Sequence, residues 1–265
     1  MADEWFELYP GLKFERHEHY ILVMTINRPD VFNATSAADH RGLSRVWLDI
    51  DDDPDTRVVV VTGAGEAFSA GGELDWIGTM VNSYEGMKPA MDEARDIVYR
   101  MTDCSKVIIS AINGVAVGAG LAVALMADIS VMNEDARLTD GHMRLGVAAG
   151  DHAVILWPLL CGMAKAKLYL LTSDFIDGRT ADEIGLVSKA VPADQVMSEA
   201  LRIATKIATG PQDAAKWTKR ALNLWIKQAA PAFEASLAME MLTFMGNDVI
   251  EGQAALAEKR RPDFD

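Results

Sequence analysis

Apolar residues follow two different spacings along this chain: short unbroken runs over the first 191 residues, and helical spacing through most of the remainder. The most informative run is residues 107–128, VIISAINGVAVGAGLAVALMAD, where a β-branched segment, an Asn-Gly turn and a small-residue bend precede an apolar segment. The β-branched segment predicts a buried strand, and the bend Gly118-Ala119-Gly120 predicts the start of a helix through Ala127. The unbroken valines within residues 57–62 predict a second buried strand.

The remaining patterns predict shorter elements around these strands. Strands are expected at residues 5–9, 19–27, 128–133 and 186–191, and helices at residues 37–51, 90–102, 152–160, 165–172 and 181–185. Residues 76–89 have a weak pattern broken by glycine and proline, which indicates a mobile segment or lid. Proline and glycine breaks divide the C-terminal part into four helices, at residues 192–209, 211–227, 231–245 and 248–259. We therefore expect a core at residues 1–191 and, at residues 192–265, an apolar helical region that also packs on a neighbouring subunit.

Two small-residue bends are candidates for binding a negative charge. Gly118-Ala119-Gly120 follows one predicted strand, and Ala70-Gly71-Gly72 in AFSAGGEL follows another. A strand that turns directly into a helix leaves backbone N–H groups unpaired at the positive end of the helix dipole, and small side chains keep the space in front of them open. The alternative is close packing of helix on sheet with no chemistry, for which small residues serve equally well.

Composition and charge limit the partners of the protein. The chain has 265 residues, half of them apolar, and a formal net charge of −14, which argues against nucleic acid or an anionic membrane as a partner. Cys104 and Cys161 lack a metal or redox spacing and are expected to be reduced, and the first ten residues are acidic without an apolar signal core. We therefore expect a cytoplasmic protein. Residues 107–127 have the length of a membrane span, but their turn and glycines fit a buried strand and helix better.

Several motifs, in order along nearly the whole chain, resemble the enoyl-CoA hydratase/isomerase (crotonase) superfamily. They are NRPDVFNA, AFSAGGEL, INGVAVGAGLAVALMADI, IGLVSKAVP and EGQAALAEKRRPDF. The resemblance implies an α/β fold, a crotonase-like spiral of ββα repeats with a C-terminal helical trimerisation region, and commonly a hexamer built as a dimer of trimers. It also implies a coenzyme A thioester as the usual ligand, with coenzyme A as part of the substrate and no separate cofactor.

The resemblance also assigns ligand-binding positions. The N–H groups of Gly72 and Ala119 match the two oxyanion donors that polarise the thioester carbonyl. Asn33, Ala34 and the segment from Ala70 to Leu74 match the region that wraps the adenine and pantetheine, and Lys259 and Arg260 match a basic group near the phosphates. A lysine that often follows the first motif in the family is Asp75 in this chain, which lessens the expected affinity for coenzyme A.

The catalytic residues depart from the family pattern. The two glutamates of a family hydratase correspond to Ala122 and His142, so a two-glutamate mechanism is excluded. A histidine moves protons near neutral pH, and a carboxylate at its far nitrogen would orient it. Asp151 is the first candidate, and its spacing from His142 resembles the dyad of the β-diketone hydrolases of the superfamily. Two alternatives stay open: His142 is an inert loop residue, or Asp151 only caps the helix that follows it.

The other polar residues are expected to be structural. The remaining histidines, which show no metal spacing, are interpreted as surface or packing residues, so no metal site is expected: His17, His19, His40 and His152. The first hypothesis is an enoyl-CoA hydratase/isomerase-type lyase in which Gly72 and Ala119 hold the enolate and His142 with Asp151 is the acid/base. The alternatives are a carbon–carbon bond hydrolase acting on a cyclic or β-diketone, and a non-catalytic acyl-CoA binding protein.

Overall fold

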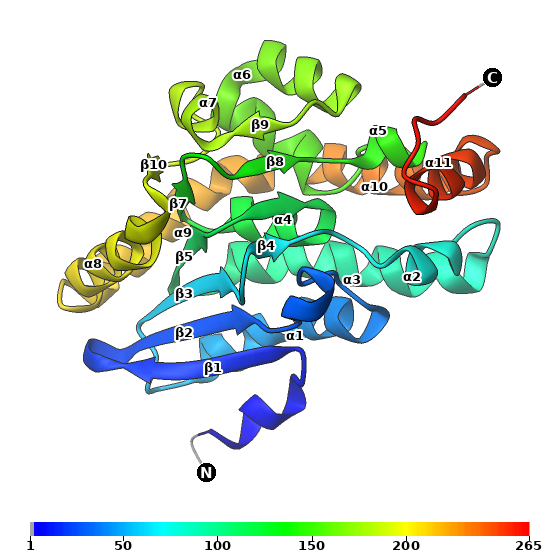
Figure 1. The fold of residues 1–265 in the computed structure, drawn as a ribbon. Helices are drawn as coiled ribbons and strands as arrows, with labels where there is room; N and C mark the ends of the chain where they lie inside the picture. The colour runs from blue at the N-terminus through cyan, green and yellow to red at the C-terminus, as the bar shows by residue number, and fades with distance from the viewer. Residues whose placement is uncertain (1–2, 265) are drawn as a thin grey trace.

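The protein, described over residues 3–264 by a computed structural model, contains two sheets (Figure 1). The six-stranded sheet has the order β1-β2-β3-β5-β7-β10, in which only the pair of β1 and β2 is antiparallel. The four-stranded sheet has the order β4-β6-β8-β9, in which only β8 and β9 are antiparallel. The first strands are β1 (Leu12–His17) and β2 (Ile21–Ile26), and the last are β9 (Ile176–Asp177) and β10 (Lys189–Val191).

A ββα unit is repeated three times between them. Its first strand joins the large sheet and its second strand joins the small one. The units are β3 (Val58–Gly63) and β4 (Ala67–Ser69) with α2 (Leu74–Gly78) and α3 (Tyr84–Asp103); β5 (Val107–Ile112) and β6 (Val115–Val117) with α4 (Gly118–Met126); and β7 (Ile129–Asn133) and β8 (Arg137–Thr139) with α5 (His142–Leu145) and α6 (His152–Thr172). Because each unit repeats the same shift between sheets, the bends after β4 and β6 lie side by side, as the pairing of these two strands requires.

The large sheet is buried on both faces, which explains its unbroken valines and isoleucines. Val58 and Val60 of β3 pack under α8 (Val196–Ala208), whereas Val59 and Val61 enter the main core. The main core also contains α1 (Ala37–Asp52), whose Trp47 is fully buried. Alternate residues of one strand thus stabilise two different layers.

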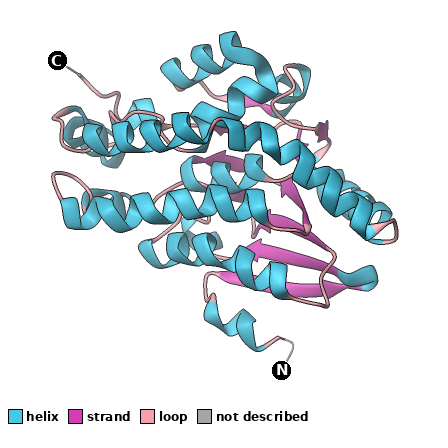
Figure 2. Cartoon of the chain, turned by 180° about the vertical axis from the view of Figure 1, so that it is seen from behind, coloured by secondary structure: helices cyan, strands magenta, loops and turns pink. Residues whose placement is uncertain are grey.

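The C-terminal part is helical, as the sequence predicts (Figure 2). After α8 come α9 (Gln212–Gln228), α10 (Ala230–Thr243) and α11 (Asp248–Ala257), each within a few residues of its predicted bounds. Helices α9 and α10 pack on α3, and α11 returns to pack on α2 and α5. The short elements that complete the fold are α7 (Gly178–Glu183) and the 3₁₀ helices η1 (Glu4–Leu8), η2 (Glu18–Tyr20), η3 (Pro29–Val31) and η4 (Ala193–Gln195).

Two sequence-based predictions of secondary structure were wrong. Residues 5–9 form η1 and not a strand, because Trp5 and Phe6 pack their rings against Phe14 of β1, a strand that the sequence analysis missed. The expected lid at residues 76–89 is instead mostly helical and packed, with Met80 and Met87 buried. Pro89 lies inside α3, in its second turn, where it removes one intrahelical hydrogen bond without ending the helix.

Helix α6 is long and apolar enough by composition to cross a membrane. It is in fact two helices that meet at Gly162, which has a left-handed φ of 77°. The two predicted helices at residues 152–160 and 165–172 correspond to these parts. Residues 107–127, which also have the length of a span, form β5, β6 and α4.

Candidate active site

A cavity of about 820 Å³ opens between the two bends, α3, α5 and α10. Its walls are mostly apolar, and its polar groups are few and grouped. Such a pocket, apolar with convergent polar groups, is typical of a small-molecule site. The lining includes residues of both bends, of α1 and α2, and of the acidic cluster around His142: Ala34, His40, Ala70, Gly72, Leu74, Trp76, Ala119, Asp140, His142, Asp151 and Glu240.

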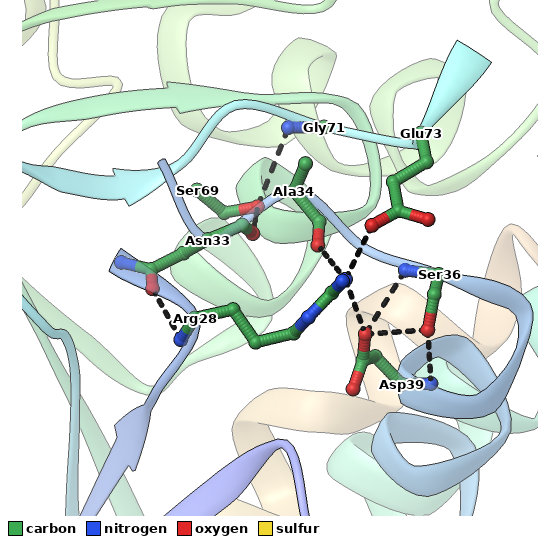
Figure 3. A network of polar contacts seen from close by, with 8 residues as sticks. All are labelled: Arg28, Asn33, Ala34, Ser36, Asp39, Ser69, Gly71 and Glu73. Carbon is green, nitrogen blue, oxygen red and sulfur yellow. Dashed lines mark hydrogen bonds and ion pairs between the residues drawn. The ribbon is translucent and has the colours of Figure 1, made fainter. Parts of the chain in front are cut away.

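A network of polar contacts holds the first bend (Figure 3). The Arg28 guanidinium bonds to the Ala34 carbonyl oxygen at 2.8 Å and pairs with Asp39 at 2.9 Å and with Glu73 at 2.6 Å. The Ser69 hydroxyl donates to the Asn33 carbonyl oxygen at 2.8 Å and accepts the Gly71 N–H at 3.3 Å. The loop before α1 and the bend after β4 are therefore one rigid unit.

The second bend faces the first. Gly118 has a φ of 52°, and a Cβ built on it would lie 3.5 Å from the Gly71 Cα and 3.9 Å from the Gly72 nitrogen. The N–H groups of Gly72 and Ala119 have no hydrogen-bond partner among the residues described, 3–264. Ala119 is in the first turn of α4, where N–H groups lack intrahelical acceptors and the helix dipole is positive. Two free donors on adjoining bends can together hold an anionic oxygen.

His142 begins α5, and carboxylates stand at both of its ring nitrogens. Its Nδ1 lies 2.8 Å from Asp140 Oδ2, and its Nε2 lies 3.5 Å from Glu240 Oε1. Asp140 and Glu240 are buried, and one oxygen of each, Oδ1 and Oε2 respectively, has no partner in the described chain. Buried oxygens without a partner are where a polar ligand atom or water is expected.

The electrostatics of this cluster raise the pKa values of both His142 and Glu240. Burial alone would lower the pKa of His142, but the charges of Asp140, Glu240 and Asp151 outweigh it and raise that pKa well above its usual value. Burial raises the pKa of Glu240, and the opposing attraction of His142 does not cancel the effect. The cluster therefore favours the protonated form of the imidazole and makes the Glu240 carboxylate a stronger base than an ordinary one.

Asp151 does not orient His142 by a direct hydrogen bond, which corrects the predicted dyad. Its Oδ1 accepts the Ala153 N–H at 3.2 Å as the cap of α6 and lies 3.0 Å from His152 Nδ1. The carboxylate on Nδ1 of His142 belongs to Asp140, which is two residues away on the same turn. Asp151 still lies close, since one ligand atom each of Asp140, His142 and Asp151 falls within 4.8 Å of the others. These are the residues that could hold a metal ion, and the expectation of no metal site stays a prediction.

Comparisons with known proteins agree with this architecture. The family model for enoyl-CoA hydratase/isomerase matches residues 16–265. The chain belongs to the enoyl-CoA hydratase/isomerase family. It is 32% identical to the short-chain-enoyl-CoA hydratase of Clostridium acetobutylicum over 92% of this chain and 94% of that protein. A crystal structure of an enoyl-CoA hydratase/isomerase from Mycobacterium paratuberculosis superposes with a TM-score of 0.87 at 33% identity, covering 92% and 97% of the two chains.

A β-diketone hydrolase is also similar. That protein, from Anabaena sp. PCC 7120 and bound to (S)-3-oxocyclohexyl acetic acid, superposes with a TM-score of 0.84 at 28% identity, covering 91% of this chain and 96% of its own. The crotonase-like α/β fold predicted for this family member is thereby confirmed, since both superpositions extend over nearly the whole chain.

The ligand-binding residues predicted from the family divide into two groups. Ala34, Ala70 and Leu74 line the cavity. Asn33 does not, because its side chain is fully buried and donates to the carbonyl oxygens of Ala64 and Ala67, each at 2.8 Å. The Asn33 side chain thus holds the first bend, and the expectation that the loop at Asn33 and Ala34 wraps the ligand stays a prediction.

The basic residues gather near the C-terminus. A smaller cavity of about 300 Å³ is lined by Arg144, Arg260 and Arg261, and shares Arg144 and Leu256 with the main cavity. Arg260 is paired with Glu251 and Glu258, and Lys259 lines neither cavity. Asp75, which replaces the expected lysine, lies on the wall of the main cavity.

Asp140, Glu240 and His40 were not among the predicted site residues. Glu240 had a signal in the sequence, because it continues the helical spacing of the buried Phe233 and Leu237 of α10. An acidic residue on such an apolar face is rarely buried unless it has a partner. Asp140 lies two residues before His142, whereas the predicted dyad pairs His142 with a carboxylate nine residues away, Asp151. His40 was interpreted as a surface or packing residue, and its ring lines the cavity.

Proposed function

We propose that this member of the enoyl-CoA hydratase/isomerase family hydrates an α,β-unsaturated acyl-CoA thioester, with His142 in place of the glutamate acid. The observation that carries the proposal is the position of the His142 imidazole, between Asp140 and Glu240 on the wall of the cavity that also exposes the free N–H groups of Gly72 and Ala119. A proton donor, a base and an oxyanion site are then available to one substrate.

The chemical step follows from these positions. The thioester carbonyl oxygen accepts the N–H groups of Gly72 and Ala119, which stabilise the enolate as negative charge develops. Glu240 takes a proton from water, the hydroxide adds to the β-carbon, and the α-carbon takes the proton of the His142 imidazolium. The proton on Glu240 then returns to His142 across the 3.5 Å between their atoms, and the site is restored. Asp140 orients the ring and stabilises its charged form.

Ala122 is consistent with this assignment because it contributes no acid or base where the family has a glutamate. In this proposal Glu240 activates the water, and it lies on α10, far along the chain from position 122. We also propose that the phosphates of coenzyme A bind the arginines of the smaller cavity and Lys259, and that the active protein is a cytoplasmic homotrimer or dimer of trimers.

A second candidate function is hydrolysis of a carbon–carbon bond in a cyclic or β-diketone. The similarity to the Anabaena β-diketone hydrolase and the absence of a carboxylate at Ala122 favour it. In this reaction Glu240 or His142 would deprotonate the attacking water. The carbon–carbon bond would then break to give a carboxylic acid and an enolate held by the N–H groups of Gly72 and Ala119, and the enolate carbon would take the proton back from the protonated base. Both candidates use the N–H groups of Gly72 and Ala119 and a base of the same cluster, so the choice of substrate distinguishes them.

The test uses crotonyl-CoA and a cyclic 1,3-diketone with the wild-type protein and the His142→Gln variant. Calorimetry measures binding, and loss of the conjugated absorbance of crotonyl-CoA measures hydration. Hydration that falls at least about a hundredfold in His142→Gln, with thioester binding retained, supports the first proposal. His17→Gln, on β1 outside the cavity, is the matched control and is expected to retain activity.

Other outcomes contradict it. Diketone cleavage without thioester binding supports the second candidate. Thioester binding without turnover of any enolate-forming substrate leaves the non-catalytic acyl-CoA binding protein as the better description.

A further inference from the structure

A second histidine with a carboxylate partner lies on the wall of the cavity, and the helices that hold the pair, α1 and α3, carry none of the proposed catalytic groups. His40 of α1 is 4% exposed, and its Nδ1 lies 2.8 Å from Glu93 Oε2 of α3. Glu93 uses its other oxygen to accept the Arg41 Nε–H at 3.2 Å. The His40 ring lines the cavity, whereas Glu93 stands behind it.

The free atom of this pair is Nε2 of His40. Because Nδ1 is bonded to Glu93, Nε2 is the remaining polar atom of the ring, and it makes no hydrogen bond to any residue between 3 and 264. A histidine that only packed against apolar neighbours would need no carboxylate partner, and holding the Glu93 carboxylate partly out of water beside the ring costs free energy. A carboxylate on the far nitrogen is instead the arrangement that fixes an imidazole for contact with a ligand.

The position of His40 relative to the oxyanion bend is defined by Trp76. The His40 and Trp76 rings lie 4.7 Å apart between centroids, and a Cβ built on Gly72 would lie 3.4 Å from the Trp76 Cζ3. The indole of Trp76 therefore lies between Gly72, the proposed oxyanion donor, and His40. The wall of the same cavity also includes buried apolar residues of α3, among them Ala90 and Ile97.

We infer that His40 determines specificity by hydrogen bonding to a hydroxyl group on the acyl part of the substrate. This inference rests on the proposed acyl-CoA function and names the substrate class within it. A hydroxyl is the group that suits His40 in either protonation state: it donates to Nε2 of the neutral ring and accepts from Nε2–H of the charged ring. A plain hydrocarbon chain leaves Nε2 without a partner in an apolar wall, which disfavours its binding.

The experiment compares thioesters that bind but cannot be hydrated. Hexanoyl-CoA and its 4-, 5- and 6-hydroxy derivatives are titrated into the wild-type protein by calorimetry. One hydroxyacyl-CoA is expected to bind about fivefold to tenfold more tightly than hexanoyl-CoA, as one neutral hydrogen bond provides. The preference is expected to disappear in His40→Phe, which keeps an aromatic ring against Trp76 but has no nitrogen.

Two further variants make the result specific. His17→Phe, which changes a histidine outside the cavity, is expected to keep the preference. Glu93→Gln is expected to reduce it, because the amide holds the ring less firmly, and this variant carries the test if the melting curve of His40→Phe shows that it does not fold.

The outcomes separate this inference from the function on which it rests. Binding of hexanoyl-CoA with no preference for any hydroxy derivative overturns the inference and leaves the proposed function intact. A preference that persists in both His40→Phe and Glu93→Gln also overturns it. If none of the thioesters binds, the proposed acyl-CoA function fails, and the inference fails with it.

Discussion

Ser69 and Gly120 are in contact across the two bends that expose the free N–H groups. Ser69 ends β4 and bonds to Asn33 and Gly71, whereas Gly120 is in the first turn of α4, one residue after Ala119. A Cβ built on Gly120 would overlap the side chain of Ser69. The absence of a side chain at position 120 therefore allows the two donors to adjoin.

The variant Gly120→Ala tests this relationship. The added methyl group must displace Ser69, which is held by its hydrogen bonds, so we expect a loss of about 1–3 kcal/mol in the free energy of unfolding. We also expect a marked fall in kcat, because the N–H groups of Gly72 and Ala119 separate. Urea unfolding and steady-state kinetics measure the two effects. Gly42→Ala, in the interior of α1, is the control and is expected to keep or raise stability. Wild-type kinetics in Gly120→Ala would contradict the idea that these bends act together.

Glu240→Gln tests the base assigned to α10. The amide keeps the size of the side chain but cannot accept a proton, so kcat is expected to fall by about 10²-fold or more. The affinity for a saturated acyl-CoA should change little, since that ligand needs no base. Glu234→Gln changes an exposed acid on the same helix and should retain activity. Equal activity of the two variants would remove Glu240 from the mechanism.

The pH dependence follows from two raised pKa values. Hydration needs Glu240 ionised and His142 protonated, and the pKa of each is raised above its ordinary value. The rate constant kcat/KM should therefore rise through the raised pKa of Glu240, reach a plateau, and fall as pH passes the raised pKa of His142. The descending limb should lie on the alkaline side of an ordinary histidine titration. A descending limb at or below the usual histidine pKa would contradict the assignment of His142 as acid.

Stability should depend on the same histidine. A raised folded-state pKa means that the native state binds the proton more tightly than the unfolded chain does. The stabilisation is fully present below the unfolded pKa of about 6.5 and is lost as pH rises through the folded value. Urea unfolding at a series of pH values should show this alkaline loss in the wild-type protein and a smaller one in His142→Gln.

Much of the fold could be predicted from the sequence because local pattern and tertiary environment agree there. The valines of β3 are buried on both sides, and the breaks between α8, α9, α10 and α11 coincide with proline or glycine. The prediction failed at β1, whose alternating Leu12, Lys13, Phe14 and Glu15 are half exposed at a sheet edge, so that charge masks the strand pattern. The aromatic residues before it, at positions 5–9, were therefore predicted to be the strand.

The site was predictable where backbone chemistry defines it and not where distant segments meet. Gly72 and Ala119 could be predicted to lie on adjoining bends because a small-residue bend between strand and helix is visible in the sequence. Glu240 lies 98 positions from His142 and reaches it only because α10 crosses the cavity. Asp151 was chosen for its spacing, yet its own helix start and His152 occupy its oxygen. Which neighbouring groups contact a carboxylate is decided by the packed structure, and not by its spacing in the sequence.

A buried ion pair joins α9 to the large sheet. The Lys219 ammonium lies 2.8 Å from Asp128 Oδ2 and donates to the Lys106 carbonyl oxygen at 2.8 Å. Removing one partner leaves the other charge buried, so Lys219→Met is expected to lower stability by about 3–5 kcal/mol, with part of the loss recovered when Asp128→Asn is added. Lys216→Met, at an exposed position on the same helix, is the control in denaturant unfolding. A change below about 1 kcal/mol in Lys219→Met would show that the pair does not hold this helix.

The apolar side chains left exposed on α9 and α10 bear on the proposed trimer. Trp217 and Trp225 are 55% and 63% exposed, and Leu242 is 70% exposed. Large apolar groups at this density on neighbouring helices indicate a surface that is covered by another chain. Sedimentation velocity should give the mass of three or six chains for the wild-type protein, and Trp225→Glu should shift it toward one, because a carboxylate would be buried without a partner. Lys13→Glu, on β1 in a different part of the fold, should keep the wild-type mass. A wild-type protein that sediments as one chain would refute the trimer and leave the site to be completed within a single chain.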